Sequence, residues 1–171
     1  MKILILGSGA REHAFCWKLL QSCYVDEIFV APGNAGTSSI AKNLNIDISN
    51  FNEIKISIIN LEIDLVIVGP EIPLIDGVVD FINNDKDLFG VLVVGPSKKG
   101  AMLEGSKDFS KEFMFKHSIP TAAYKTFNSD HLNDGLNYLE TIESPYVLKA
   151  DGPAAGKGVL ILNELEEAKR E

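Results

Sequence analysis

Cysteine is scarce in this sequence, and its placement excludes several classes of protein. The 171 residues contain two cysteines, Cys16 and Cys23. Both fall in one expected helix, about two turns or roughly 10 Å apart, which is too far for a disulfide. They also lack the spacing of a metal or redox motif. We therefore expect reduced cysteines in a cytoplasmic protein.

Basic charge and long apolar runs are scarce as well. Lys and Arg number 16 against 24 Asp and Glu, which gives a formal net charge of -8 and a pI near 4.9. An acidic surface repels phosphodiester backbones, so we expect no nucleic-acid partner, although a local site for a small anion is compatible with this charge. The apolar opening of the chain, residues 1–6, is broken at Gly7 and is too short for a secretion signal or a membrane span.

The pattern of the first hundred residues is that of a parallel sheet covered by helices. Short β-branched runs alternate there with segments of helical periodicity. The expected strands are residues 2–6, 27–30, 45–48, 65–68 and 91–94. The expected helices are residues 12–22, 74–83 and a segment that Asn50 caps and that runs through Ile54, Ile58 and Ile59.

The loops that follow these strands should meet at one edge of the sheet. Right-handed crossovers bring the carboxyl ends of parallel strands together, and small ligands usually bind at that edge. The loops concerned are residues 7–11, 31–37, 69–74 and 95–99. Their glycines, prolines and asparagine are also what ordinary turns use, but turn chemistry does not require all four loops to share an edge. Glu71 is our candidate for hydrogen bonds to sugar hydroxyls.

The first of these loops precedes a helix whose N-terminal N–H groups could hold a phosphate. The dinucleotide fingerprint fails here, because it needs a third glycine where the chain has Glu12 and an acidic residue where Ala31 ends the second strand. A tight turn without any ligand is the simpler alternative. His13 is equally compatible with an ordinary helix residue.

The pattern changes after residue 100, where we expect a domain boundary. Residues 101–117 should be helical and end before Pro120. A strand at 124–127, a helix at 130–140, strands at 146–150 and 158–162, and a helix capped by Asn163 should follow. Because two strands and a partial helix bury too little apolar surface to close a domain, we expect the chain to be part of a longer protein.

The last two strands are joined by a loop of small residues that contains a lysine. Lys149 lies near the end of the first strand, and Lys157 lies next to Gly158 at the start of the second. Ammonium groups and backbone N–H groups in such a strand–loop–strand arrangement can surround a polyphosphate. The sequence is one residue short of a Walker P-loop and leads into a strand instead of a helix. A glycine-rich hairpin connection is the simpler alternative.

Five motifs in order resemble the glycinamide ribonucleotide synthetase family. They are GSGAREHA at 7–14, PGN at 32–34, VGPE at 68–71, LEGSKDF at 103–109, and KADG with AGKG at 149–158. The resemblance implies an α/β fold, with a Rossmann-like, parallel-sheet substrate-binding domain at 1–100 followed by the beginning of an ATP-grasp domain at 101–171. Ala10 stands where the family usually has glycine, and Pro153 where it usually has leucine, which removes one amide donor from the loop.

The same resemblance implies a ligase of purine synthesis that uses ATP. Such an enzyme joins glycine to 5-phosphoribosylamine through glycyl phosphate, with Mg2+ or Mn2+, and is a monomer or weak dimer. The metal ligands would lie beyond Glu171, so this chain alone should be inactive. The implied ATP-binding residues are Lys107, Lys149, Asp151, Gly152, Gly156, Lys157 and Gly158. The implied phosphoribosylamine-binding residues are Gly9, Ala10, Arg11, Asn34, Gly36, Pro70 and Glu71.

Two alternatives stay open. One is another purine-pathway ATP-grasp enzyme, such as a carboxylase or a formyl-transferring enzyme, which would share the fold but not the Arg11–Glu12–His13–Ala14 and Pro70–Glu71 loops. The other is a nucleotide-binding module without turnover.

Overall fold

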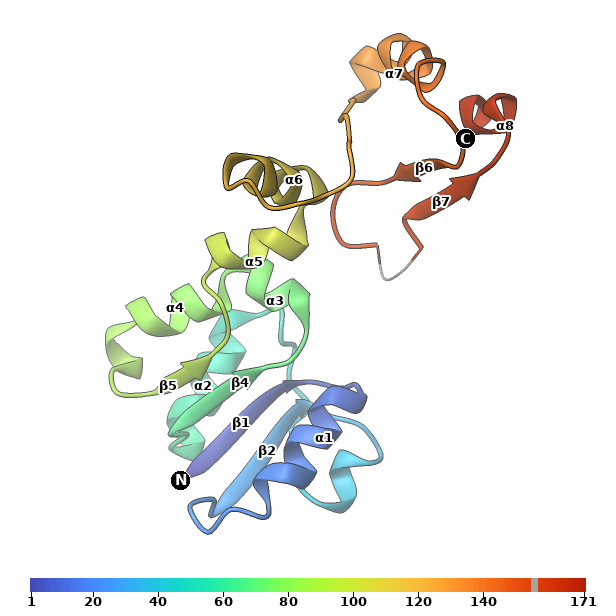
Figure 1. The fold of residues 1–171 in the computed structure, drawn as a ribbon. Coiled ribbons are helices and arrows are strands. Elements are labelled where there is room, and N and C mark those ends of the chain that lie inside the picture. Colours follow the sequence, from blue (N-terminus) through green and yellow to red (C-terminus); the bar gives the residue numbers. More distant parts are fainter. Residues whose placement is uncertain (155–156) are drawn as a thin grey trace. The chain divides into compact units, whose positions relative to one another are not determined.

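The computed structural model describes residues 1–154 and 157–171, and the chain divides into two compact units, Met1–Ala101 and Met102–Glu171 (Figure 1). The strands of the first unit are β1 (Lys2–Gly7), β2 (Glu27–Pro32), β3 (Lys42–Asn43), β4 (Leu65–Val68) and β5 (Leu92–Val94). Its helices are α1 (Ala10–Leu19), α2 (Phe51–Leu61), α3 (Glu71–Asp76) and α4 (Val78–Asn84), with 3-10 turns at Thr37–Ser39 and Lys86–Leu88. The boundary between the units falls within α5 (Lys98–Gly105).

The five strands form one parallel sheet in the order β3-β2-β1-β4-β5. This arrangement confirms the expected parallel α/β fold. The strand order reverses at β1, because the chain adds β2 and β3 on one side of it and β4 and β5 on the other. The loops after β1 and β4 therefore lie side by side at the carboxyl edge, at the kind of switch point where open α/β sheets bind ligands.

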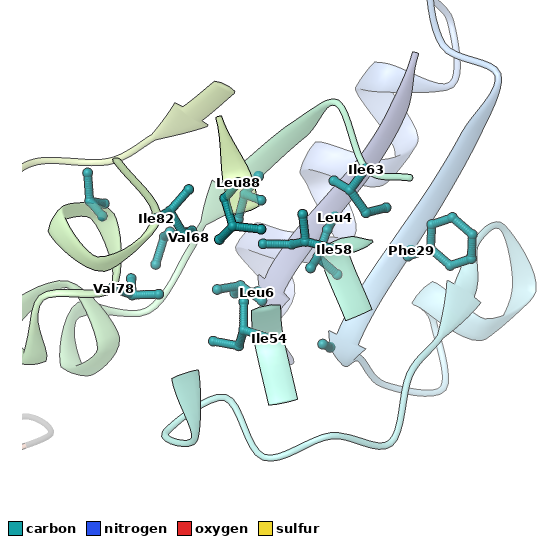
Figure 2. Packing of buried hydrophobic residues seen from close by; sticks show 13 residues of the cluster. Leu4, Leu6, Phe29, Ile54, Ile58, Ile63, Val68, Val78, Ile82 and Leu88 are labelled. Carbon is teal, nitrogen blue, oxygen red and sulfur yellow. The ribbon is translucent and has the colours of Figure 1, made fainter. Parts of the chain in front are cut away.

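Side chains of the central strands alternate between two apolar layers. One layer joins Leu4 and Leu6 of β1 to residues of α2 and α4 (Figure 2). The other joins Ile3 and Ile5 to Cys16 of α1. All four β1 side chains are fully buried, and each such burial stabilises the fold by about 1.5–3 kcal/mol. The apolar content of β1 is thus explained by helices on both of its faces.

Three expectations for the first unit were wrong in detail. The strand expected at 45–48 does not form, since β2 pairs with Lys42–Asn43 instead. Leu44, Ile46 and Ile48 still pack against the core, so their alternation reflects burial and not strand pairing. The helix expected at 74–83 is two helices that meet at Gly77, whose φ is +102°. Helix α1 ends at Leu19, which leaves Cys23 exposed and outside the helix while Cys16 is buried.

The second unit contains α6 (Lys107–Lys116), α7 (Leu132–Leu139), β6 (Tyr146–Lys149), β7 (Val159–Leu162) and α8 (Leu165–Arg170), with a 3-10 turn at Ser129–His131. Strands β6 and β7 form an antiparallel pair. One face of this pair packs through Tyr146 on α7 and α8, where Leu139 and Ala168 are buried.

Other expectations for this unit also need correction. The helix expected at 101–117 is divided at Ser106, whose side chain caps α6 by accepting a hydrogen bond from the N–H of Phe109 at 3.1 Å. Residues 124–127 form no strand. The N-cap of α8 is Glu164 and not Asn163. Within the residues that the structure describes, no helix has the length and apolar character needed to cross a membrane.

A three-residue ionic cluster joins α2 to the turn after α4. The ammonium of Lys55 donates to both carboxylate oxygens of Asp85, at 2.9 and 2.7 Å, and to Asp87 at 2.6 Å. The hydrogen bond from Lys55 lowers the pKa of Asp85 below its ordinary value of 3.8. A carboxyl group with a lowered folded-state pKa stabilises the fold above its ordinary pKa, and this contribution disappears as the pH falls through the folded value.

We therefore expect Asp85→Asn to flatten the acid limb of the stability curve of the first unit. Between about pH 6 and about pH 3, the urea midpoint of the wild type should fall more steeply than that of the variant. Asparagine can still accept the N–H of Asp87, so the change isolates the charge. Trp17, the only tryptophan, reports on this unit by fluorescence. Asp76→Asn, at the exposed end of α3, is the control, and equal slopes for Asp85→Asn and the wild type would contradict the prediction.

Candidate functional site

The carboxyl edge of the first unit is organised around a buried glutamate. Glu12, in the first turn of α1, is 4% exposed. Its carboxylate accepts the N–H of Gly9 at 2.5 Å and packs against Gly7 and Gly69, where a Cβ atom on either glycine would collide with it. Glu12 thus links the loop after β1 to the loop after β4. Sequence reasoning missed this role, because it treated Glu12 as a residue that breaks the dinucleotide fingerprint and as a member of the family motif at 7–14.

Asn34 joins the loop after β2 to the same place. Its amide nitrogen donates to the carbonyl oxygens of Ser8 and Gly9 at 2.8 and 3.2 Å. Its amide oxygen accepts the N–H groups of Gly36 and Thr37 at 2.7 and 2.9 Å. The structure therefore brings Gly9, Asn34 and Gly36 together, as the sequence predicted for this edge. The side chain of Asn34 is occupied by these backbone contacts, and its local role is to shape the two loops.

Two charged residues of the predicted set lie close together beside these loops. The guanidinium of Arg11 approaches the carboxylate of Glu71 to 3.7 Å. Arg11 is 70% exposed and Glu71 34% exposed, so both keep donor or acceptor capacity for a ligand. Ala10 begins α1, and the first N–H groups of that helix have no partner within it. Pro70 is the N-cap of α3, which places Glu71 at the first position of the helix.

The predicted ATP-binding residues converge in part on the start of α6. The carboxylate of Asp151 accepts the N–H of Lys107 at 2.6 Å, the N–H of Asp108 at 3.3 Å and the hydroxyl of Ser106 at 3.0 Å. The ammonium of Lys107 donates to the carbonyl oxygen of Gly152 at 2.7 Å. Desolvation raises the pKa of Asp151, but the hydrogen bonds from the two N–H groups and the hydroxyl outweigh it and hold the pKa below its ordinary value.

The other predicted residues lie along the hairpin. Lys149 ends β6 with an exposed side chain, and Lys157 is exposed just before β7. Gly158 accepts the N–H of Ala150 at 2.9 Å and so extends the pairing of the two strands by one bond. Gly156 lies outside the described residues. The hairpin therefore presents two exposed lysine side chains where the loop between its strands begins and ends.

The residues present do not fit a bound Mg2+ or Mn2+ ion. Within residues 1–154 and 157–171, no three His, Cys, Asp or Glu side chains converge as metal ligands. Asp151, the carboxylate next to the predicted lysines, already accepts three hydrogen bonds from the start of α6.

A doubly wound parallel domain, followed by a unit with a lysine-bearing helix and a strand–loop–strand hairpin, defines the class of ATP-grasp proteins. The family model for the phosphoribosylglycinamide synthetase N domain matches residues 1–104, and the model for the ATP-grasp (A) domain of the same synthetase matches residues 105–171. The chain belongs to the phosphoribosylglycinamide synthetase family.

Individual relatives agree with this assignment. The phosphoribosylamine–glycine ligase of Caldanaerobacter subterraneus is 45% identical over 169 residues, which are 99% of this chain and 39% of the relative. The crystal structure of the Thermotoga maritima phosphoribosylamine–glycine ligase superposes with a TM-score of 0.73 at 34% identity, over 99% of this chain and 38% of that one. The N5-carboxyaminoimidazole ribonucleotide synthetase of Thermotoga maritima shares the fold at 18% identity, with a TM-score of 0.67 over 97% of this chain and 42% of that one. The chain thus spans about two fifths of the curated relatives it matches.

The packing of Glu12 predicts that its side chain is what excludes a Cβ atom at position 69. Gly69→Ala should destabilise the first unit by about 1–3 kcal/mol, since the new methyl group displaces the Glu12 carboxylate. In a Glu12→Ala background the same change should cost much less. Urea unfolding of the wild type, the two single variants and the double variant, followed by Trp17 fluorescence, measures this coupling. An equal cost of Gly69→Ala in both backgrounds would show that Glu12 is not what excludes the side chain.

Proposed function

We propose that the protein containing this chain ligates glycine to 5-phosphoribosylamine, with ATP cleaved to ADP and phosphate, in purine synthesis. The observation that carries the proposal is that both units match one synthetase family in order. The candidate residues lie at the carboxyl edge of one sheet, at the start of α6 and around the loop of one hairpin, which supports it. Relatives that match over nearly the whole chain carry the name phosphoribosylamine–glycine ligase. We further propose that the enzyme acts in the cytoplasm as a monomer or weak dimer.

In this proposal the first unit binds phosphoribosylamine. The free N–H groups at the start of α1 and the exposed guanidinium of Arg11 suit a phosphate group, because both place N–H donors around an anion. The carboxylate of Glu71 suits ribose hydroxyls, which are donors. Asn34 contributes indirectly, because its contacts with Ser8 and Gly9 hold the backbone at the site in shape.

The second unit would bind the phosphates of ATP. Lys149 and Lys157 are exposed on the hairpin, and Lys107 uses one ammonium hydrogen on Gly152. An ammonium group has three N–H donors, so two of those on Lys107 remain for phosphate oxygens. Three lysines would offset part of the triphosphate charge in a protein whose net charge is -8.

The proposed reaction has two steps. The carboxylate of glycine attacks the γ-phosphorus, which forms a C–O–P bond and releases ADP. The amine of phosphoribosylamine then attacks the carbonyl carbon of glycyl phosphate, loses a proton, and releases phosphate. Lysine ammonium groups would stabilise the charge that develops on the phosphoryl oxygens during the first step. The N5-carboxyaminoimidazole ribonucleotide synthetase of Thermotoga maritima shows likeness of fold only, which gives no support to the alternative of another purine-pathway ATP-grasp enzyme.

The activity can be tested on the complete reading frame that contains this chain. Purified protein should release phosphate from ATP only when glycine and phosphoribosylamine are both present, and glycinamide ribonucleotide should appear in equal amount. Bicarbonate should not replace glycine. Phosphate release that ignores glycine would contradict the proposal, and binding of ATP without turnover would favour a nucleotide-binding module.

The assignment of Lys149 gives a separate prediction. Lys149→Ala in the complete protein should lower kcat/KM for ATP about 10- to 100-fold, because a hydrogen bond to a charged group contributes about 1.5–3 kcal/mol. The control is Lys116→Ala, at the exposed end of α6. Steady-state kinetics with ATP as the varied substrate measures the effect, and equal values for Lys149→Ala and Lys116→Ala would exclude Lys149 from the phosphate site.

A further inference from the structure

The start of α6 has no N–H group left for a phosphate. The N–H groups of Lys107 and Asp108 donate to the Asp151 carboxylate, and that of Phe109 donates to the Ser106 hydroxyl. The next N–H, of Ser110, donates to the carbonyl oxygen of Ser106 at 3.0 Å. The groups that a helix normally leaves unpaired at its N-terminus are therefore all used within the protein.

Asp151 is consequently a poor candidate for contact with ATP. A carboxylate repels the phosphates of a nucleotide, and both oxygens of this one already accept hydrogen bonds. Its negative charge instead lies at the positive end of α6, where it is stabilising. Asp151, which the resemblance placed among the ATP-binding residues, is thus bound to the start of α6.

A second contact joins the start of α6 to the residues that follow β6, and here the side chain of Lys107 is the donor. The Lys107 ammonium donates to the carbonyl oxygen of Gly152, at 2.7 Å. Gly152 has a φ of +85°, in the left-handed region that favours glycine. The backbone turns at this residue, directly after Asp151, and directs its carbonyl oxygen to the lysine. Ser106, Lys107, Asp151 and Gly152 together form what we call the α6 clasp.

We propose that Asp151 is a positioning residue that sets the two phosphate-binding lysines relative to each other. Its carboxylate holds the backbone of Lys107, and Asp151 itself follows Lys149 by two residues, about 7 Å of extended chain. The α6 clasp therefore ties the helix that carries one lysine to the end of the strand that carries the other. Its role in ATP use rests on the proposed function, whereas the clasp itself does not.

The clasp can be tested without nucleotide, by amide hydrogen exchange of the complete protein that contains this chain. Asp151→Ala should speed exchange at Lys107 and Asp108 about tenfold or more, and Asp151→Asn should have a smaller effect because an amide oxygen still accepts. The amide of Met114, within α6, should not change. Glu143→Gln, an exposed carboxyl-to-amide change before β6, is the control. Unchanged exchange at Lys107 and Asp108 in Asp151→Ala would overturn the clasp.

The positioning role is tested by kinetics of the complete protein. Asp151→Ala should lower kcat/KM for ATP about tenfold in the wild type but much less in a Lys107→Ala background, which keeps the backbone N–H while removing the ammonium. If the fold losses of kcat/KM in the two single variants multiply in the double variant, Asp151 is an independent ligand. A wild-type kcat/KM for Asp151→Ala would exclude any role of Asp151 in ATP use. Either result would overturn the positioning role. Absence of glycine-dependent turnover in the wild type would contradict the proposed function alone and leave the exchange result valid.

Discussion

The burial of β1 on both faces is the constraint on which the first unit depends. Its side chains alternate between two apolar layers, so β1 has to lie in the middle of the sheet with helices above and below it. The chain adds β2 and β3 on one side of β1 and β4 and β5 on the other, so the strand order reverses at β1. The reversal separates the helices that follow β1 and β4 and leaves the carboxyl ends of these strands open to a ligand. The position of the proposed binding edge thus follows from how the core is packed.

Glycine and one carboxylate then determine how closely the loops approach at that edge. Gly7 and Gly69 leave the space that the side chain of Glu12 fills, and Asn34 fastens the third loop to Ser8 and Gly9. Glu12 is buried and the side chain of Asn34 is fully used by backbone contacts, whereas the charged groups of Arg11 and Glu71 remain partly exposed. The residues that shape the edge are therefore different from those that have free hydrogen-bonding capacity.

The architecture could be predicted from the sequence because it depends on local patterns of burial. Runs such as residues 65–68 indicate strands covered on both faces, and Asn50 caps α2 as expected. The strand expected at 45–48 was wrong because its residues are buried without pairing to a neighbouring strand. Ile46 and Ile48 alternate as a strand would, yet they only pack on the core. The contact of Glu12 with Gly69 and those of Asp151 with the start of α6 could not be predicted, because each joins segments far apart in the sequence.

Asp151 belongs to a motif that the resemblance assigns to ATP, yet its carboxylate contacts the start of α6. A resemblance transfers a set of residues to a site but does not say which of them touch the ligand. Two lysines near a polyphosphate repel each other, and both lose side-chain freedom when they are held together. A carboxylate between their segments offsets part of that cost by fixing the backbone that carries them. An acidic residue in a phosphate-binding motif is then expected on physical grounds, as the partner of the helix and not of the nucleotide.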